Sequence, residues 1–180
     1  SPGSKLLLAV GRLAARKGYG TLIRGFSALN KEMPNTKLVI VGRGHLKRRL
    51  MRLAKSLGVG EDITIESSLS FAELAQLYRS SDLVVYPSFY EGQGLIPLEA
   101  MASGVPVVTV DHGPLPEMVD ESVGALFTMG NIESMVSVMK EVLKAGRKKG
   151  EKGRARVLQK FTYSGNAESF ENIYLEAINR

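Results

Sequence analysis

Short apolar runs alternate with longer amphipathic segments along the whole chain, and this alternation is the feature that most constrains the fold. The short runs are rich in Leu, Val and Ile on both faces. They lie at residues 5–10, 37–41, 63–66, 83–86, 105–110 and 125–127. Strands that are apolar on both faces are typical of parallel sheets covered by helices on both sides. The sequence therefore predicts an α/β fold with a doubly wound parallel sheet of about six strands.

The longer segments between these runs have helical periodicity. We expect helices at residues 19–33, 45–57, 71–80, 95–102 and 131–145. Ser70 and Glu73 have the spacing of a capping box at the start of the third of these helices. The stretch from Ala145 to Gly153, rich in Gly and Lys, predicts a break before a last helix near 164–178. Ligands of doubly wound sheets bind at the carboxyl ends of the strands, so the loops there hold the candidate site residues.

Composition excludes several other classes of protein. The chain has 180 residues, of which 44% are hydrophobic and 23% charged, as expected of one folded domain rather than a disordered or membrane-spanning protein. It contains no cysteine, which excludes disulfides and thiolate metal sites and is compatible with a reducing compartment. We therefore expect a cytoplasmic location.

Charge is strongly segregated along the chain. The 24 Lys and Arg residues and 18 Asp and Glu residues give 24 − 18 = +6. Residues 1–55 contribute 13 − 1 = +12, residues 56–139 contribute 1 − 12 = −11, and residues 140–180 contribute 10 − 5 = +5. The modest total therefore conceals two basic segments that flank an acidic one.

The loop after the first predicted strand is suited to binding an anion. Gly11 and Gly18 bracket the cations Arg12, Arg16 and Lys17 directly before a predicted helix. Fixed positive charge and a helix N-terminus both attract anions. A solvated basic turn explains the same residues equally well.

The loop after the fourth predicted strand combines free amides with two carboxylates. The backbone amides of Gly94, Leu95 and Ile96 lie at the start of a predicted helix, where they can donate to an anion. Glu91 precedes this turn and Glu99 lies about one helical turn beyond it. The helix dipole alone can account for either glutamate. Together they suit a ligand that carries sugar hydroxyls on both sides of a phosphate.

This segment resembles the signature of the retaining GT-B glycosyltransferases of family 4. The resemblance lies in Glu91-Gly92-x-Gly94-Leu95 followed by Glu99-Ala100-Met101-Ala102-x-Gly104-x-Pro106-Val107-Val108. It extends in the same order to Gly11-Arg12-Leu13 with Lys17-Gly18, Val41-Gly42-x-Gly44, Leu77-Tyr78 with Ser81-Asp82, and Gly113 with Glu117. It thus covers nearly the whole chain, and it implies a Rossmann-like domain that forms one half of a GT-B fold.

The resemblance also implies a role for individual residues. Gly11, Arg12 and Lys17, with the amides of Gly94, Leu95 and Ile96, would bind the diphosphate of a UDP-, GDP- or ADP-sugar. Glu99 would accept hydrogen bonds from the ribose, and Glu91 would hold the donor sugar. Arg12, Lys17 and Glu91 are accordingly the expected catalytic residues. No cofactor and no metal are expected.

Residues 1–180 would then be the C-terminal, nucleotide-sugar-binding domain, and its N-terminal acceptor domain would be absent. We expect the chain to be cut from a longer protein or paired with a separate subunit, and to catalyse no transfer alone. A non-catalytic sugar-nucleotide-binding subunit or sensor would keep the same residues.

The basic segments allow peripheral contact with an anionic membrane at its inner face. They lack the interleaved aromatic residues of a nucleic-acid-binding surface, so no nucleic-acid partner is expected.

The last predicted helix resembles the closing helix of the family, which crosses back to the N-terminal domain. Without that domain, we expect Phe170, Ile173 and Tyr174 to form an exposed apolar stripe, partly covered by self-association. The alternative is a helix that folds onto its own domain.

Overall fold

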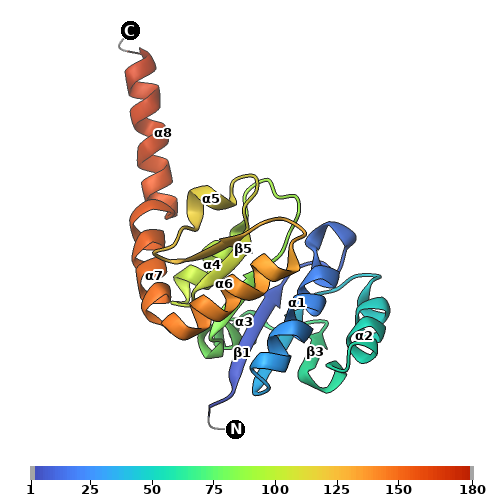
Figure 1. Cartoon of the computed structure of the whole chain (residues 1–180). Helices are drawn as coiled ribbons and strands as arrows, with labels where there is room; N and C mark the ends of the chain where they lie inside the picture. The colour runs from blue at the N-terminus through green and yellow to red at the C-terminus, as the bar shows by residue number, and fades with distance from the viewer. Residues whose placement is uncertain (1–2, 179–180) are drawn as a thin grey trace.

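The computed structural model describes residues 3–178 and contains a six-stranded sheet with the order β3-β2-β1-β4-β5-β6 (Figure 1). All neighbouring strands are parallel. The strands are β1 (Lys5–Val10), β2 (Thr36–Val41), β3 (Ile63–Glu66), β4 (Leu83–Tyr86), β5 (Val107–Val110) and β6 (Gly124–Phe127). The predicted doubly wound sheet is thus confirmed.

Helices cover both faces of this sheet. One face packs against α1 (Tyr19–Glu32), α2 (Lys47–Ser56) and α6 (Ile132–Ala145), and the other against α3 (Phe71–Ser80), α4 (Leu95–Ala102) and α7 (Lys148–Lys160). The remaining helices are α5 (Leu115–Met118), α8 (Tyr163–Ile178) and two short 3₁₀ turns at Ala15–Lys17 and Gly60–Asp62. The capping box of Ser70 and Glu73 is present at the start of α3.

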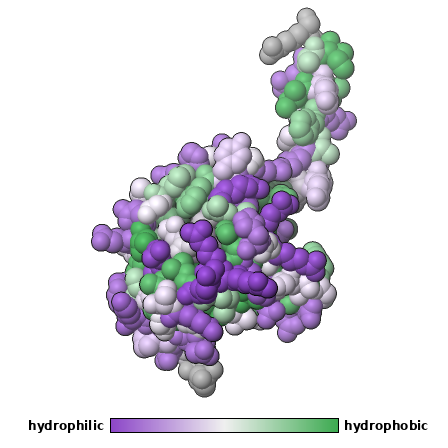
Figure 2. All heavy atoms as spheres, turned by 90° about the vertical axis from the view of Figure 1, so that its right-hand side faces the viewer, coloured by the Kyte–Doolittle hydropathy of each residue, from purple (hydrophilic) through white to green (hydrophobic). Residues whose placement is uncertain are grey.

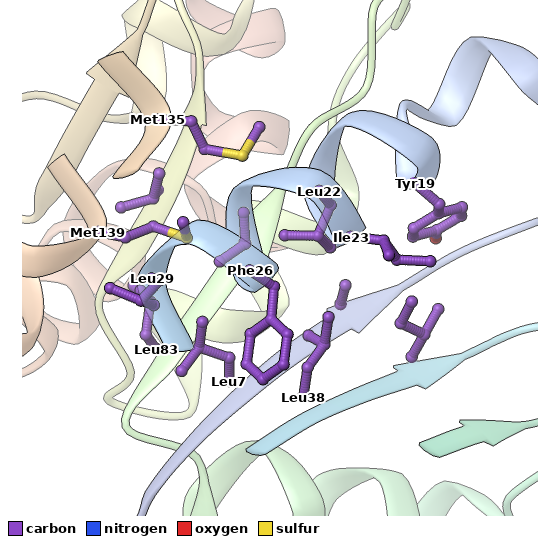
Figure 3. Packing of buried hydrophobic residues seen from close by; sticks show 14 of the residues in the cluster. Leu7, Tyr19, Leu22, Ile23, Phe26, Leu29, Leu38, Leu83, Met135 and Met139 are labelled. Carbon is purple, nitrogen blue, oxygen red and sulfur yellow. The ribbon is translucent and has the colours of Figure 1, made fainter. Parts of the chain in front are cut away.

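Two apolar clusters, one on each face, hold the layers together. Along β1, Leu7 belongs to the cluster beneath α1 while Leu8 belongs to the opposite cluster, because successive strand residues point to opposite faces. Phe26 is fully buried between α1 and the sheet (Figure 3). Burial of each such side chain contributes roughly 1.5–3 kcal/mol, so both faces stabilise the fold.

The predicted break from Ala145 to Gly153 is confirmed only at Gly146 and Arg147, and its predicted length is wrong, because α7 already begins at Lys148. The glycines of this stretch permit close helix packing instead of ending a helix. A Cβ at Gly150 would overlap the carbonyl oxygen of Gly104, and one at Gly153 would lie 3.0 Å from Cγ of Met101. Both glycines therefore let α7 approach α4 and its C-terminal turn.

The helix α8 projects away from the rest of the domain (Figure 1). None of its side chains is buried, and Phe170, Ile173 and Tyr174 are each 60% exposed or more. The predicted exposed apolar stripe is confirmed, and the alternative of a helix folded onto its own domain is wrong. Self-association through this stripe stays a prediction. No helix within residues 3–178 is long and apolar enough to cross a membrane.

The close packing at Gly150 predicts the stability of an alanine variant. Alanine normally stabilises a helix relative to glycine, but Gly150→Ala should lower the free energy of unfolding by about 1–3 kcal/mol through overpacking. Gly20, in the first turn of α1, has open space around it, so Gly20→Ala should raise that free energy by roughly 0.5–1 kcal/mol. Urea unfolding of both variants measures the difference. Equal effects at the two positions would contradict the packing role of Gly150.

Candidate functional site

The candidate site lies where the strand order of the sheet reverses direction. From β1 the chain proceeds to β2 on one side, whereas β4, on the other side of β1, is followed by β5. Loops that leave two adjacent strands at such a point diverge and open a crevice at the carboxyl edge. Residues 11–18 follow β1 and residues 87–94 follow β4, so the two loops selected from the sequence lie at this crevice.

The two loops are bonded to each other through Arg16. Its carbonyl accepts a hydrogen bond of 2.8 Å from the amide of Phe89, and its guanidinium donates to the carbonyl of Tyr90 over 3.3 Å. Gly18 has a φ of 69° and touches Pro87 so closely that a Cβ would overlap the proline carbonyl oxygen. The loops therefore form a single structural unit.

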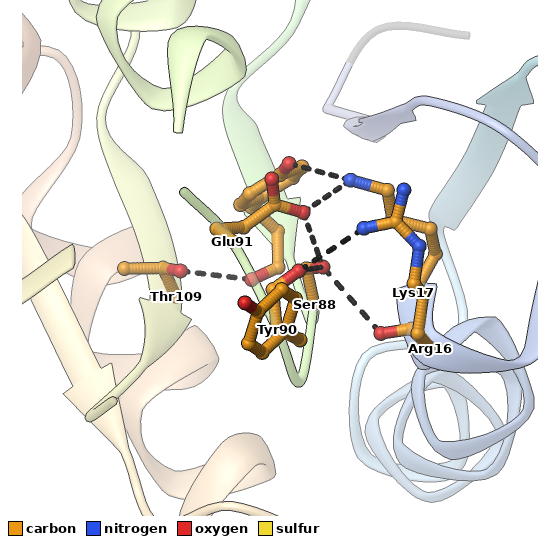
Figure 4. Close-up of polar contacts among 7 residues, drawn as sticks. Arg16, Lys17, Ser88, Tyr90, Glu91 and Thr109 are labelled. Atoms are coloured by element: carbon orange, nitrogen blue, oxygen red, sulfur yellow. Dashed lines mark hydrogen bonds and ion pairs between the residues drawn. The ribbon is translucent and has the colours of Figure 1, made fainter. Parts of the chain in front are cut away.

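Lys17 and Glu91 form an ion pair between these loops (Figure 4). Nζ of Lys17 also donates to the Tyr86 hydroxyl over 3.0 Å and lies 5.3 Å from the centre of that ring. Ser88 donates its hydroxyl to Glu91 over 2.5 Å. The side chains of Lys17 and Glu91 are only 11% and 12% exposed. Because little water reaches them, each charge is stabilised mainly by its partner.

These contacts keep Glu91 ionised. Burial acts to raise the pKa of Glu91, but the hydrogen bonds from Lys17 and Ser88 outweigh it, and the pKa lies below its ordinary value. Burial, and then the neighbouring Glu91, raise the pKa of Tyr86, so its hydroxyl stays protonated. The cluster thus holds one cation and one carboxylate.

Glu99 lies apart from this cluster, on α4. It is exposed and accepts a hydrogen bond of 2.9 Å from the buried hydroxyl of Tyr78 on α3. It borders a cavity of about 760 Å³, together with Gly92 and Leu95, and a second cavity of about 270 Å³ against α3. Gly94 precedes α4, and no described side chain caps this helix end. Its first amides are therefore available to a ligand.

The structure brings together only some of the predicted site residues. It joins Lys17 to Glu91, and it places Gly94, Leu95 and Ile96 at the uncapped start of α4 as expected. Arg12 is exposed, and its side chain forms no hydrogen bond or ion pair with any residue from 3 to 178. Gly11 follows the last residue of β1. The roles of all of these residues stay predictions.

Four further residues support the site: the sequence assigns no role to Tyr78, Tyr86 and Ser88, and it places Arg16 only among the cations of an anion-binding loop. Arg16 joins the loops, Tyr86 and Ser88 hold the ion pair, and Tyr78 holds Glu99. The only signal available for Tyr86 and Ser88 was their position at the end of a strand. No three His, Cys, Asp or Glu side chains gather as a metal site within the described residues.

Comparisons with known proteins bear on this geometry. The family model of the glycosyl transferases group 1 matches residues 1–157. An uncharacterised glycosyltransferase of Methanocaldococcus jannaschii is 40% identical over 123 residues, which are 68% of this chain and 31% of that protein. The D-inositol 3-phosphate glycosyltransferase of Corynebacterium aurimucosum is 31% identical over 98% of this chain and 44% of its own length. The chain thus spans less than half of either relative.

A solved structure matches the chain over nearly its whole length. It is the C-terminal domain of a glycosyl transferase group 1 family protein from Francisella tularensis, with a TM-score of 0.81 and 27% identity. The match covers 90% of this chain and 88% of that domain.

The ion pair predicts a pH-dependent loss of stability on substitution. Glu91→Gln leaves the nearly buried Lys17 without its counter-charge and should lower the free energy of unfolding by about 1–3 kcal/mol at neutral pH. Because the folded-state pKa of Glu91 is lowered, this stability is present above the ordinary glutamate value of 4.5 and is lost as the pH falls through the folded-state pKa. Urea unfolding at several pH values measures the effect.

The matched control is Glu121→Gln, because the side chain of Glu121 is exposed and forms no hydrogen bond or ion pair within residues 3–178. The free energy of unfolding of Glu121→Gln should equal that of the wild type within about 0.5 kcal/mol. A difference between wild type and Glu91→Gln that stayed constant from neutral to acid pH would contradict the ionic role of Glu91.

Proposed function

Because the chain belongs to the glycosyl transferases group 1 family, we propose that it is the domain of a GT-B glycosyltransferase that binds the nucleotide-sugar donor. One observation carries this proposal. At the reversal of the strand order, a cation suited to a diphosphate is paired with a carboxylate suited to sugar hydroxyls. In a nucleotide-sugar donor, the diphosphate and the sugar hydroxyls lie within a few bonds of each other.

The proposal includes a second domain, which would supply the acceptor site. The chain spans 31% and 44% of the two curated relatives, which leaves room in proteins of their length for another domain. The match to an isolated C-terminal domain supports the same position for this chain. The complete protein would then transfer a sugar to a glycan, lipid or small-molecule acceptor in the cleft between the two domains.

In this proposal the cations act on the leaving group. Cleavage of the bond between sugar and phosphate develops negative charge on the nucleoside diphosphate, and fixed cations beside the phosphates stabilise that charge. Lys17 would supply a point charge and the exposed Arg12 a planar fork for two oxygens. The free amides at the start of α4 would donate to the same phosphates.

The carboxylates would recognise the sugars on either side of the diphosphate. Glu99 would accept hydrogen bonds from the ribose, in an orientation fixed by the Tyr78 hydroxyl. Glu91 would accept from the donor sugar. Since Lys17 is paired with Glu91 in the free chain, a donor would replace that pair by two new contacts, phosphate to Lys17 and hydroxyl to Glu91.

The finer features of the proposal derive from the motif resemblance. They are assignment to family 4, retention of the anomeric configuration, a UDP-, GDP- or ADP-sugar as donor, and independence of metal. A cytoplasmic location is proposed separately, from the absence of cysteine. A non-catalytic sugar-nucleotide-binding subunit is the second candidate, because it would retain the same donor contacts. Activity of the complete polypeptide distinguishes the two.

A titration with nucleotides tests donor binding. UDP, GDP and ADP are added separately in the presence of EDTA. At least one of them should shift the NMR amide signals of Arg12, Lys17 and Leu95. The chain alone should transfer no sugar from the matching donor. Absence of any shift near these residues with all three nucleotides would contradict the proposal.

The ribose contact of Glu99 has a sharper test. Glu99→Gln should weaken binding of the preferred nucleoside diphosphate roughly tenfold, as expected for loss of a charged hydrogen-bond acceptor. The 2′-deoxy nucleotide should bind the wild type about as weakly as the normal nucleotide binds Glu99→Gln. Its affinity should fall little further when Glu99 is replaced by Gln. Glu121→Gln should bind both nucleotides as the wild type does. Equal losses for both nucleotides in Glu99→Gln would show that Glu99 does not contact the ribose.

A further inference from the structure

The helix α2 presents an arc of cations to solvent. Arg48, Arg49, Arg52 and Lys55 are all exposed, whereas Leu50 and Ala54 on the inner side are buried. At 3.6 residues per turn the four cations fall within about 120° of the helix circumference. Figure 2 faces the side of the molecule on which α2 lies, and strongly hydrophilic side chains gather across the centre of this face.

This arrangement is unfavourable for the isolated helix. The first turn of α2 contains no acidic residue, although the helix dipole favours acids there and disfavours cations such as Arg48 and Arg49. Arg48 and Arg52 are four residues apart, a spacing at which like charges destabilise a helix. Within residues 3–178 none of the four charged side chains donates a hydrogen bond or forms an ion pair. No direct contact in this part of the chain therefore offsets their mutual repulsion.

The second basic helix, α7, differs in this respect. Arg147, directly before α7, donates to the carbonyl of Arg79 over 2.6 Å, and Arg154 of α7 donates to that of Ala102 over 2.5 Å. Both therefore cap the ends of neighbouring helices. Arg156 binds Asp120 over 2.6 Å and lowers the pKa of that carboxyl to about 2. Several cations on and beside α7 thus stabilise the domain itself, whereas those of the arc on α2 have no such partner.

The cations of α2 adjoin an apolar recess. A cavity of about 300 Å³ lies between α1 and α2 and has Leu46, Leu53 and Phe89 among its apolar walls. Arg24 of α1 and Arg49 of α2 also line it, and the side chain of Arg24 has no hydrogen bond or ion pair to another described residue. Apolar space beside unpaired arginines suits a molecule that joins an anionic group to an apolar one.

We propose that the face formed by Arg24 and the outer side of α2 docks on an anionic phospholipid membrane. Charge complementarity supports this occupant, since cations held close to an anionic surface each strengthen binding to it. A convex arc on one helix meets a flat surface with several cations at once. The apolar recess matches the amphiphilic nature of a phospholipid, and α2 carries no aromatic residue on which nucleic-acid bases would stack. This inference does not depend on the donor-binding proposal.

Co-sedimentation with vesicles tests the docking surface. The full chain should sediment with vesicles of phosphatidylglycerol and phosphatidylcholine but not with vesicles of phosphatidylcholine alone. Raising the salt from about 0.1 M to about 1 M shortens the Debye length from about 10 Å to about 3 Å and should release it. Failure to bind the anionic vesicles at low salt would overturn the proposal.

Two matched charge reversals locate the binding surface. Arg48→Glu with Arg52→Glu changes an exposed pair of cations four residues apart on α2, and Lys148→Glu with Lys152→Glu makes the same change on α7. The α2 variant should bind anionic vesicles at least about 30-fold more weakly, given the contribution of each cation near such a surface. The α7 variant, with the same net charge, should keep most of the binding. Equal losses in both variants would show an effect of bulk charge and overturn the assignment to α2.

The α2 variant should remain folded, because both positions are exposed and the dipole favours the glutamate at position 48, in the first turn. Circular dichroism and nucleotide binding check this, since neither Arg48 nor Arg52 belongs to the proposed donor site. If the chain bound duplex DNA or RNA through Arg48 and Arg52 but did not bind anionic vesicles, the membrane proposal would be wrong. This face would then be assigned to nucleic acid.

Discussion

The close contact between the loops that follow β1 and β4 is the constraint on which the candidate site depends. The parallel sheet brings the ends of these strands side by side, and the contact of Gly18 with Pro87 then allows the loops to touch. Arg16 ties them together through the backbone at Phe89 and Tyr90. Only with this junction in place can Lys17 and Glu91, which are 74 positions apart in sequence, form a nearly buried ion pair.

Most of the fold follows from local sequence patterns, and its main deviation has a tertiary cause. The bounds of β1, β3, β4, α3 and α4 agree with the predicted segments, because apolar runs, helical periodicity and the capping box at Ser70 all act within a few residues. The start of α7 could not be predicted in this way. Gly150 and Gly153 are unfavourable in an isolated helix, and their role becomes visible only when α4 packs against them.

The candidate site is predictable to a similar degree. The sequence predicts Lys17 and Glu91 near one ligand because the strand ends of a parallel sheet share one edge, and the structure joins them directly. The direct bond itself was not expected, and neither was the support from Tyr86 and Ser88, because partners chosen by side-chain packing leave no periodic signal in the sequence. The hydrogen bond between Tyr78 and Glu99 joins α3 to α4 on one face of the sheet. It too depends on side-chain packing and leaves no periodic signal in the sequence.

The ion pair of Lys17 and Glu91 has a consequence for competition among small anions. A bare lysine in a crevice would attract inorganic phosphate or any other abundant anion, whereas this lysine is already neutralised by a nearly buried carboxylate. A simple anion that approaches Lys17 must displace Glu91 and leave that carboxylate without a donor, which is unfavourable in a partly dehydrated site. A ligand that brings hydroxyl groups together with its negative charge satisfies both partners. In the proposed donor site, the pair would therefore favour such a ligand over inorganic phosphate.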